Sequence, residues 1–467
     1  MTHRNKCAVF LFTRDLRTSD NTSLIELTNK YRNTAYILPI FIFNPEQVGT
    51  HNPYKSEPAI RFMCECLADL QATKIPDLML FRGDPVSVLA RVHATIPIQA
   101  IALNHDYTPF AAKREAALLA LSKKIGADFI CRPDYLLLPN LILNKSNRVY
   151  VKFSPFYRVA VKKAPATPTK ISAAFAPPAI CAKFSPLTLE HAAPQLHLPA
   201  TYTPNVVGGR SHAFTLLHHI AQAGIGRAYS KTRDYPTLPT TNLSAYIKFG
   251  TISIREAYYF MRNALKLPRS HSLVKQLYWR EFYTVVLYKH PQVLGHSMRP
   301  SYSVKWSRDT TKFAAWTAGR TGFPLVDAGM RQIAATGYMH NRVRMVVADF
   351  LVKLLHIDWR IGEKYFANKL IDYDVAVNNG SWQWQAGSGT DSQPYYRIFN
   401  PWMQAFKFDR ECVYIIRWVP ELKDVPPRDI IKWDKLHKEY TKKGIYLAPI
   451  IDYSKEKKIA LKLLAGV

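Results

Sequence analysis

Short apolar runs alternate with helix-like segments in the first third of the chain, and this alternation constrains the fold more than any other feature. The apolar runs are CAVFLF at 7–12, AYILPIFIF at 35–43, LMLFR at 78–82, AIALN at 100–104 and ADFICR at 127–132. Between them one helix is expected to begin at Ser56, with Pro58 just inside it, and another to end at Gly126. Continuous apolar strands separated by helices predict a parallel sheet covered on both faces. We therefore predict a doubly wound α/β domain over residues 1–135.

The pattern changes twice after that domain. Between Val161 and Pro204 eight prolines occur among alanines and threonines. Because proline removes a backbone donor and disfavours helix before it, we predict a surface-wrapping linker over 136–207 with little regular structure. From Gly208 onward apolar residues recur at three- and four-residue spacing, as in LVKQLYWREFYTVVLYKH. We predict an all-α domain over 208–467, which also holds all nine tryptophans.

The chain is strongly basic. Its 63 lysines and arginines exceed its 34 acids, for a net charge of +29 at pH 7. Such an excess favours a polyanionic partner, nucleic acid before an acidic membrane, and a generally basic surface is the alternative. No apolar run approaches the ~18 residues of a membrane span, and the start MTHRNKCAVFLF lacks a secretory pattern. We expect an intracellular protein that has no transmembrane segment.

The six cysteines point to a reducing compartment, the cytoplasm or the nucleus. In a chain of 467 residues they are typical of reduced, mostly buried thiols. Cys64 and Cys66 lie two residues apart on a predicted helix, so they point to different faces and are not expected to form a metal pair.

Familiar catalytic motifs are missing from the sequence. It contains no H-E-x-x-H, no C-x-x-C, no Walker A motif and no G-x-S-x-G, and no G-x-G-x-x-G follows the first strand. We therefore expect no metal enzyme, no acyl-enzyme hydrolase and no standard dinucleotide site in the first domain. His105, His340 and His356 are isolated in sequence, which is typical of structural histidines. Any chemistry would have to come from a cofactor.

The stretch MHNRVRM at 339–345 places polar and basic residues at the head of an apolar helix. Asn341 can cap that helix or hydrogen-bond the edge of a base, Arg342 can contact phosphate, and Arg344 can pair with Asp372. The structural alternative is a capped surface helix with solvated arginines.

Two further stretches combine aromatic, basic and hydroxyl side chains. YWREFY at 278–283 places tryptophan, arginine and glutamate consecutively on a predicted helix, and TTNLS at 240–244 offers donors that suit a phosphate. An amphipathic core helix and an ordinary turn are the structural alternatives. Aromatics interleaved with basic residues are what base stacking and phosphate neutralisation need, so the residues alone predict a nucleic-acid-binding protein.

Residues 372–391, DYDVAVNNGSWQWQAGSGTD, place two tryptophans one residue apart in a polar, glycine-rich neighbourhood. The stretch fits neither a clean helix nor a clean strand, and we predict a turn at Asn378-Asn379-Gly380. The structural alternative is a pair of core tryptophans that pin a loop.

Together these motifs resemble the photolyase and cryptochrome family, most closely its class I cyclobutane pyrimidine dimer (CPD) photolyases. The resemblance rests on FLFTRDLRTSDN, RDYPTLPTTNLSAYIKFGTIS, YWREFY, GFPLVDAGMRQIAATGYMHNRVRM, DWRIGEKYF, DYDVAVNNGSWQWQ and GTDSQPYYRIFNP, in family order over almost the whole chain. It implies a folded-up FAD in the helical domain and light-driven repair of damaged DNA. Excited reduced flavin would pass an electron to a flipped-out pyrimidine dimer, the cyclobutane ring would split, and the electron would return.

The resemblance also implies roles for individual residues. Flavin contacts fall on Tyr229, Thr240, Thr241, Asn242, Leu243, Ser244, Arg280, Arg344, Asp372 and Asp374, with Asn378 facing flavin N5. The relay that photoreduces the flavin falls on Trp306, Trp359 and Trp382. The dimer pocket falls on Gln276, Trp279, Asn341, Arg342, Met345 and Trp384, and contacts to the DNA strand fall on Arg233, Arg397, Gln404 and Lys407.

Two positions depart from the family pattern. The glutamate that binds the dimer is replaced by Gln276, which can still donate to a thymine carbonyl and accept from an imide N–H but carries no charge. Glutamine there also occurs in (6-4) photolyases and cryptochromes, although HNRVRM lacks the second active-site histidine of a (6-4) enzyme, which favours the CPD lesion. The glutamate that holds a folate antenna falls on Ala111, so the identity of a second antenna chromophore stays open.

Three functions therefore compete. The resemblance favours a monomeric CPD photolyase, with a (6-4) photolyase as the alternative lesion choice. A cryptochrome-type photoreceptor without repair activity is the main rival, and the absence of an extended tail after LKLLAGV argues against it. A non-catalytic DNA-binding module would lack FAD.

Overall fold

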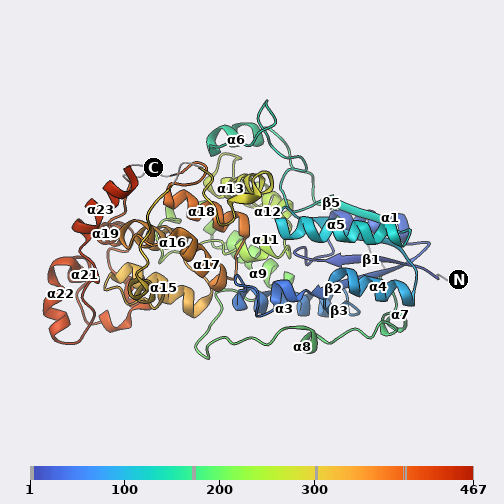
Figure 1. Cartoon of the computed structure of the whole chain (residues 1–467), viewed down its shortest axis with the longest axis horizontal. Coiled ribbons are helices and arrows are strands. Elements are labelled where there is room, and N and C mark those ends of the chain that lie inside the picture. Colours follow the sequence, from blue (N-terminus) through green and yellow to red (C-terminus); the bar gives the residue numbers. More distant parts are fainter. Residues whose placement is uncertain (1–4, 171–174, 300–302, 393, 395–396, 466–467) are drawn as a thin grey trace. The chain divides into compact units, whose positions relative to one another are not determined.

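Figure 1 shows a computed structural model of the chain, which describes residues 5–170, 175–299, 303–392, 394 and 397–465. The chain forms two compact units. Unit 1 comprises Met1–His197, Val206–Arg227 and Thr241–Pro291, and unit 2 comprises Leu198–Asn205, Ala228–Thr240 and Gln292–Val467. The basic tip at 1–4, and Gln393, Tyr395 and Tyr396 of the last quoted motif, lie outside the described residues.

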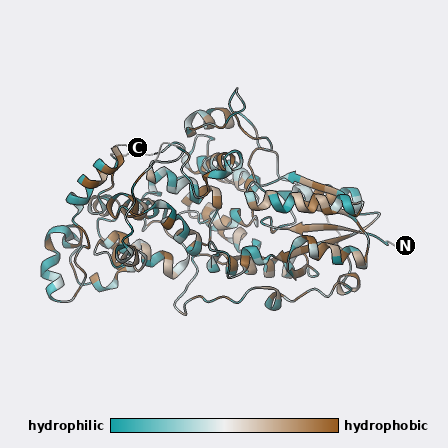
Figure 2. Ribbon diagram, in the orientation of Figure 1, coloured by the Kyte–Doolittle hydropathy of each residue, from teal (hydrophilic) through white to brown (hydrophobic). Residues whose placement is uncertain are grey.

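Unit 1 is built on a parallel sheet. Its five strands are β1 (Cys7–Phe12), β2 (Tyr36–Phe43), β3 (Met79–Arg82), β4 (Ile98–His105) and β5 (Asp128–Pro133). Their order is β3-β2-β1-β4-β5, so the chain moves from β1 to one edge and then from β4 to the other. The strands are mainly brown, that is hydrophobic, in Figure 2, as expected for a sheet buried on both faces. The predicted doubly wound α/β fold is confirmed.

The helices that connect these strands are α1 (Thr22–Tyr31), α2 (Pro45–Val48), α3 (Glu57–Thr73), α4 (Pro85–Thr95) and α5 (Pro109–Lys124). The two predicted signals, Ser56 and Gly126, mark the start of α3 and the end of α5. The hydroxyl of Ser56 accepts a hydrogen bond from the Ala59 N–H at 3.1 Å and caps α3. Gly126 follows α5 in the left-handed region, with φ of 67°, a conformation that glycine adopts without steric cost.

A buried ionic network joins the loop after β1 to a helix far along the chain. Arg255 donates to Asp20 Oδ2 at 2.9 Å and to Asp134 Oδ1 at 2.7 Å, while Arg17 donates to Asp134 Oδ2 at 2.6 Å. All four side chains are at most 8% exposed. Burial alone would raise the pKa of Asp134, but the charges of Arg17 and Arg255 outweigh it and hold that pKa at about 2.

The rest of unit 1 is helical or extended. Its elements are α6 (Phe153–Ala160), α7 (Pro178–Ala182), α8 (Leu189–Ala192), α9 (Arg210–Gln222), α11 (Ser244–Lys248), α12 (Ile254–Tyr259), a π-helical turn η1 (Phe260–Ala264) and α13 (Ser272–Lys289). Within the proline-rich stretch, the Leu187 N–H donates to the Leu80 carbonyl on β3 at 2.8 Å. That stretch therefore follows an edge of the sheet with only short helices of its own, and Figure 1 shows α8 within a long extended segment.

Unit 2 is helical throughout its described part, apart from one isolated bridge between Ser307 and Ile357. α10 (Ile225–Thr232) leads into it from unit 1. Its other elements are η2 (Pro291–Val293), α14 (Thr310–Thr317), α15 (Pro324–Thr336), α16 (Asn341–Asp349), η3 (Phe350–Leu354), α17 (Trp359–Lys369), α18 (Val375–Ala386), α19 (Pro401–Phe408), α20 (Val413–Trp418), η4 (Pro420–Leu422), α21 (Pro427–Ile431), α22 (Trp433–Lys442) and α23 (Tyr453–Ala465). One hydrophobic cluster that includes Trp316, Trp359 and Trp382 forms the core.

Two predictions from composition concern membrane spans and thiols, and both can be compared with the described part of the chain. No helix there is both long and apolar enough to cross a membrane. All six cysteines are free thiols, four buried and two partly exposed. Cys64 is partly exposed and Cys66 buried, so the two point to different faces of α3, as their spacing predicts.

Candidate functional site

An arginine in the first turn of α16 pairs with an aspartate in the loop before α18. Arg344 Nη2 lies 3.2 and 3.1 Å from the two carboxylate oxygens of Asp372, and Arg344 Nε donates to the Met339 carbonyl at 2.7 Å. Asp372 is 9% exposed, so the pair is largely removed from water and firmly oriented. The predicted pairing of Arg344 with Asp372 is confirmed.

The cap of α16 differs from one prediction. His340, not Asn341, is the N-cap, because its Nδ1 accepts from the Arg342 N–H at 3.2 Å. Asn341 is the first helical residue, exposed, with its amide 3.9 Å from the Met345 sulfur. Burial lowers the pKa of His340 to about 4, which keeps the ring neutral and leaves Nδ1 free to accept. Asn341 is thus not needed as the cap, and its exposed side chain can be reached by a ligand.

The predicted turn at Asn378-Asn379-Gly380 is wrong, because these residues lie inside helix α18. Asp374 caps the helix by accepting from the Ala376 and Val377 N–H groups at 3.1 Å. The polar side chains suit a helix here because they have buried partners. Asn379 and Gln383 both donate to the Val293 carbonyl at 3.1 Å, and Gln383 also donates to Asn379 at 3.0 Å.

Asn378 lies beside a second buried carboxyl group. Its side-chain N–H donates to the backbone carbonyl of Glu363 at 3.0 Å, and Asn378 and Glu363 are 8% and 3% exposed. Burial raises the pKa of Glu363 to about 7, although hydrogen bonds from Asn378 and Asn379 act in the opposite direction. Asn378 therefore presents its amide next to a group that exchanges a proton near neutral pH.

Glu363→Gln is expected to remove a pH dependence of stability. Because the pKa of Glu363 is about 7 when folded and about 4.3 when unfolded, the folded state binds the proton more tightly. Stability is then full below about pH 4.3 and is lost as pH rises through 7, by roughly 3–4 kcal/mol in all. Urea unfolding of both proteins at several values between pH 5 and 8 should show the wild type losing this stability and the variant keeping it. Parallel curves for the two proteins would contradict the assignment.

All three predicted relay tryptophans lie in one hydrophobic cluster of unit 2. Trp382 and Trp359 are 2% and 1% exposed, and Trp306 packs against the same cluster while remaining partly exposed. Trp382 approaches α17 so closely that a Cβ at Gly362 would lie 2.3 Å from its indole ring. Trp384, two residues further along α18, is partly exposed, so the two tryptophans point to different sides of the helix.

Trp279 belongs to unit 1, where its indole is stacked on a residue that sequence reasoning missed. The rings of Trp279 and Phe153 are parallel to within 7° with centroids 3.7 Å apart. Phe153 begins α6, in the segment predicted as linker. Its aromatic character was the only feature of the sequence that could have indicated a role in stacking. On the same helix α13, Gln276 donates to the Ser272 carbonyl at 3.1 Å, which leaves its amide oxygen to accept from a ligand.

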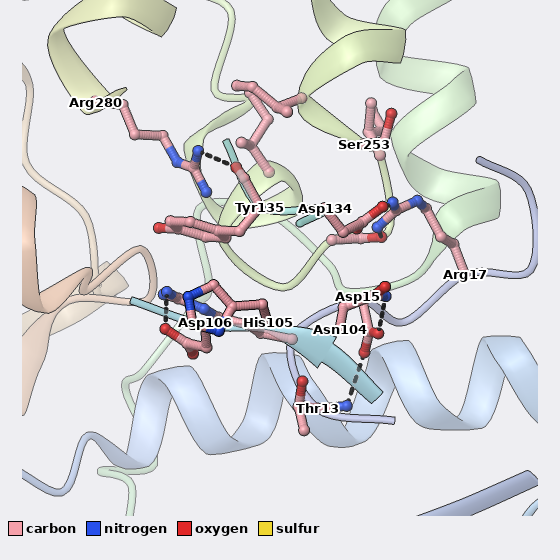
Figure 3. Close-up of a pocket in the computed structure, with 15 residues that line it drawn as sticks. Thr13, Asp15, Arg17, Asn104, His105, Asp106, Asp134, Tyr135, Ser253 and Arg280 are labelled. Atoms are coloured by element: carbon pink, nitrogen blue, oxygen red, sulfur yellow. Dashed lines mark hydrogen bonds and ion pairs between the residues drawn. The ribbon is translucent and has the colours of Figure 1, made fainter. Parts of the chain in front are cut away.

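Arg280 faces a small polar cavity of unit 1 (Figure 3). It donates to the Tyr135 carbonyl at 2.8 Å and stacks on the Tyr135 ring at 3.5 Å, while Arg14 stacks on the same ring at 3.6 Å. Figure 3 shows Asp15 held by Thr13 and Asn104 at the cavity wall. The cavity volume is about 20 Å³, which is room for about one water molecule. The sequence analysis did not predict this cavity, although Thr13, Arg14, Asp15 and Arg17 of its lining belong to the motif FLFTRDLRTSD.

The loop 240–244 adopts a strained backbone. Asn242 has a positive φ of 49°, followed by Leu243 in the right-handed helical region. Successive left- and right-handed residues turn neighbouring N–H groups to one side, an arrangement that suits a phosphate. Ser244 then begins α11.

In unit 2, Thr240 lies 3.4 Å from the Tyr338 hydroxyl, and burial raises the pKa of Tyr229 to about 12.

The residues matched to DNA contacts gather in unit 2. Tyr235 packs edge-on against Phe408 with ring centroids 5.9 Å apart, which brings the segment of Arg233 beside α19 and its Lys407. Arg233, Arg397 and Lys407 are exposed. Around them Met403, Phe406, Tyr235 and Leu238 are 56%, 43%, 40% and 41% exposed. Basic and aromatic groups are thus exposed together on α19 and on the segment 233–238 that packs beside it.

Two residues of the predicted DNA set differ in their contacts within the protein. Arg342 forms an ion pair with Asp234 at 2.7 Å and stacks on Phe408, so the predicted phosphate contact would compete with an acid. Gln404 is partly exposed, and its buried Oε1 has no hydrogen-bond partner among the described residues.

Comparison with known proteins agrees with this geometry. Residues 8–176 match the family described as "DNA photolyase", and residues 273–465 match "FAD binding domain of DNA photolyase". A deoxyribodipyrimidine photo-lyase of Halobacterium salinarum is 34% identical, with 97% of this chain and 98% of the relative covered. The photo-lyase of Escherichia coli is 32% identical over 89% of each chain.

Solved structures give the same result. An archaeal photolyase from Sulfolobus tokodaii, described with two FAD molecules, superposes with a TM-score of 0.85 at 37% identity and covers 99% of this chain and 100% of its own. A class III photolyase from Agrobacterium tumefaciens gives a TM-score of 0.87 at 29% identity, covering 100% of this chain and 98% of its own. The two units are thus those of a flavin-binding light-dependent repair fold. The chain belongs to the DNA photolyase family.

Proposed function

We propose that this chain is a deoxyribodipyrimidine photo-lyase that repairs CPD lesions in DNA under blue light. Helix α18 carries the proposal, because a single helix holds three of the required groups. Asn378 is buried beside Glu363, Trp382 is buried in the aromatic cluster, and Trp384 lies partly exposed on another side. The 34% identity to full-length photo-lyases supports the same activity.

The donor set of the described residues fits FAD. The Arg344–Asp372 pair offers an oriented charge and hydrogen-bond donors, and Asn378 offers an amide beside a carboxyl whose pKa is about 7. Asn242 and its neighbours offer a turn that suits phosphate, and Tyr229, Arg280 and Asp374 complete the set by family position. When bound, reduced FAD supplies the light-excited electron that splits the cyclobutane ring. The protein's part is to hold that group, orient it and exclude water.

The lesion contacts are assigned by family position, within each unit separately. Unit 1 supplies Gln276 and Trp279, and unit 2 supplies Asn341, Met345 and Trp384. Aromatic faces stack on a flipped base, and the amides of Gln276 and Asn341 match its hydrogen-bonding edge. A neutral glutamine serves where the family uses a carboxylate. It costs less to desolvate and stabilises nearby positive charge less well.

Repair of defined lesions tests this function. The purified FAD-containing protein, reduced beforehand, should convert CPD-containing duplex to intact thymines under blue light and not in darkness. Repair of the (6-4) lesion alone would replace the CPD assignment, with Gln276 as the motivating residue. FAD binding without repair of either lesion would favour a cryptochrome. The absorption spectrum of the same preparation identifies any second chromophore.

DNA binding is expected to depend steeply on salt. Each phosphate contact made by Arg233, Arg397 or Lys407 should add about 0.9 to the slope of log affinity against log salt, because bound counterions are released. Lys407→Ala should lower that slope by about 1, whereas Lys438→Ala, an exposed lysine on α22, should not change it. Binding of a CPD duplex at increasing salt measures this. A flat curve, or equal slopes for the two variants, would rule out the proposed surface.

We also propose that the enzyme acts as a monomer in a reducing intracellular compartment. The free thiols support the compartment, because such thiols persist where disulfides are reduced. Size-exclusion chromatography with light scattering tests the oligomeric state.

A further inference from the structure

The β4–α5–β5 segment of unit 1 brings three metal-binding side chains together. In the parallel register Leu103 of β4 is paired with Cys131 of β5. Residues two apart on a strand share a face, so His105 lies on the same face as Leu103 and therefore as Cys131. That face contacts α5, since Leu118 and Leu121 of α5 belong to the same hydrophobic cluster as Leu103.

α5 supplies the third side chain. Glu115 precedes Leu118 by three residues and therefore lies on the face of α5 that meets the sheet. Its Oε2 is 2.7 Å from His105 Nδ1, and its Oε1 accepts from the Asp106 N–H at 2.9 Å. The backbone N–H thus orients the carboxylate towards the histidine. The ligand atoms of His105, Glu115 and Cys131 all lie within 4.8 Å of one another.

We propose that His105, Glu115 and Cys131 bind a Zn²⁺ ion, with a water molecule as the fourth ligand. Imidazole nitrogen, carboxylate oxygen and thiolate sulfur are the three donor types that proteins offer to zinc. Bond lengths of about 2.0 and 2.3 Å place nitrogen and sulfur donors about 3.5 Å apart in a tetrahedral site. Because the ligand atoms now lie within 4.8 Å of one another, they need to move by about 1 Å to complete the site.

The surroundings suit an ion that enters from solvent. The side chains of His105 and Glu115 are 23% and 12% exposed, and Cys131 is also partly exposed. Because all three side chains are only partly buried, a water molecule can reach the ion as its fourth ligand. The Tyr107 and Tyr288 rings pack edge-on against His105, with centroids 4.6 and 5.8 Å away, and fix its plane.

Arg132 and Arg114 place positive charge near the site, and a negative group compensates the charge of each. Arg132 is bound at its Nε and Nη2 by Glu26, which neutralises its charge. Arg114 carries buried Nε and Nη2 groups that have no hydrogen-bond partner within the described ranges. A thiolate at Cys131 would offset the charge of Arg114. Glu115 and a Cys131 thiolate together match the charge of Zn²⁺.

A hydrogen-bonded His105–Glu115 pair without metal is the competing explanation, and titration separates the two. The full-length FAD-containing protein, freed of metal with EDTA, is titrated with ZnCl₂ by calorimetry. We expect one Zn²⁺ per chain at micromolar concentration. Cys131→Ser and His105→Gln should each weaken binding roughly tenfold or more. Cys64→Ser is the matched control, because Cys64 is likewise a partly exposed free thiol, and it should bind as the wild type does.

Alkylation of the wild-type protein gives a second readout that needs no variant. Zn²⁺ should protect Cys131, but not Cys64, from iodoacetamide, as read by peptide mass spectrometry. Equal alkylation of Cys131 with and without Zn²⁺, or micromolar binding that survives both ligand variants, would overturn the zinc site. So would a wild-type protein that binds no Zn²⁺ in this range. None of these outcomes affects the proposed repair activity, which is measured separately.

Discussion

Arg255→Met is expected to lower the free energy of unfolding by about 3–5 kcal/mol, the typical cost of removing one partner of a buried ion pair. Arg255 contacts the carboxylates of Asp20 and Asp134 and the Asp20 carbonyl, and its side chain is 8% exposed. Methionine fills a similar volume but leaves Asp134 buried with only Arg17 as a cationic partner. The loss comes from an uncompensated charge rather than from a cavity.

The loss should shrink at low pH, which distinguishes it from a packing defect. In the wild type the pKa of Asp134 is about 2, so its stabilising effect is present above about 3.9, the unfolded value, and fades as pH falls towards 2. In Arg255→Met that pKa rises, because one of the two charges that lower it is gone. Asp134 then becomes protonated in the variant at a pH where it is still ionised in the wild type. Protonation removes the insufficiently paired buried charge, so the difference in stability between the two proteins becomes smaller.

Urea unfolding at pH 7 and pH 4 measures both effects. Arg132→Met is the matched control, because Arg132 pairs with Glu26 at the surface, with side chains 48% and 37% exposed. Surface pairs contribute about 0–1 kcal/mol, so this variant should stay close to the wild type. A loss in Arg255→Met below about 1 kcal/mol, or one that is constant with pH, would show that the network is not stabilising.

The sheet of unit 1 was predictable because its signals are local. Each strand is a continuous apolar run, and Ser56 and Gly126 mark helix ends through hydrogen bonds and backbone angles that depend on neighbouring residues only. The same is true of the helical periodicity after Gly208. Local signals of this kind do not depend on which distant segments pack together.

The errors arose where distant partners decide the outcome. Asn378, Asn379 and Gly380 favour a turn in isolation, yet the Val293 carbonyl, far away in sequence, accepts from Asn379 and from Gln383 and makes a helix favourable. At α16 the buried ring of His340 takes the cap that Asn341 would otherwise fill. Helix propensity and capping preference are weak compared with tertiary hydrogen bonds.

In the candidate site, too, some contacts could be predicted from the motifs, whereas contacts between distant segments could not. Motif order assigned Arg344 and Asp372 to one another, and the structure places them 3.1 Å apart. The motifs did not indicate that Phe153 stacks on Trp279, because Phe153 lies outside every motif used. They also did not indicate the contact of Glu281 in YWREFY, which is fully buried and accepts from the Leu137 N–H at 2.9 Å. Such contacts join segments more than a hundred residues apart, and only the folded chain reveals them.

Trp306→Phe is expected to abolish photoreduction of oxidised FAD while leaving repair by the pre-reduced enzyme unchanged. Trp382 and Trp359 are buried, and Trp306 is the partly exposed member of the same cluster. An external donor can therefore reach the relay only at Trp306, and phenylalanine is far harder to oxidise than tryptophan. Splitting of the dimer needs an electron from the already reduced cofactor, so the relay does not take part in that step.

Trp316→Phe is the matched control. Trp316 lies in the same cluster, fully buried, with its ring centroid 6.5 Å from that of Trp382 and its Nε1 donating to the Val347 carbonyl at 3.1 Å. Its loss should cost about 1 kcal/mol of stability through the missing hydrogen bond. Photoreduction should continue, because family position assigns the relay to Trp382, Trp359 and Trp306 and not to Trp316.

The measurement is absorbance of oxidised FAD under blue light with an external thiol donor, followed by repair of a CPD duplex after chemical reduction. If Trp316→Phe stops photoreduction and Trp306→Phe does not, the electron path runs through Trp316. If Trp306→Phe also stops repair by the pre-reduced protein, the substitution has disturbed the fold around α17 rather than the relay. Only loss of photoreduction together with intact repair assigns Trp306 as the point where electrons enter the protein.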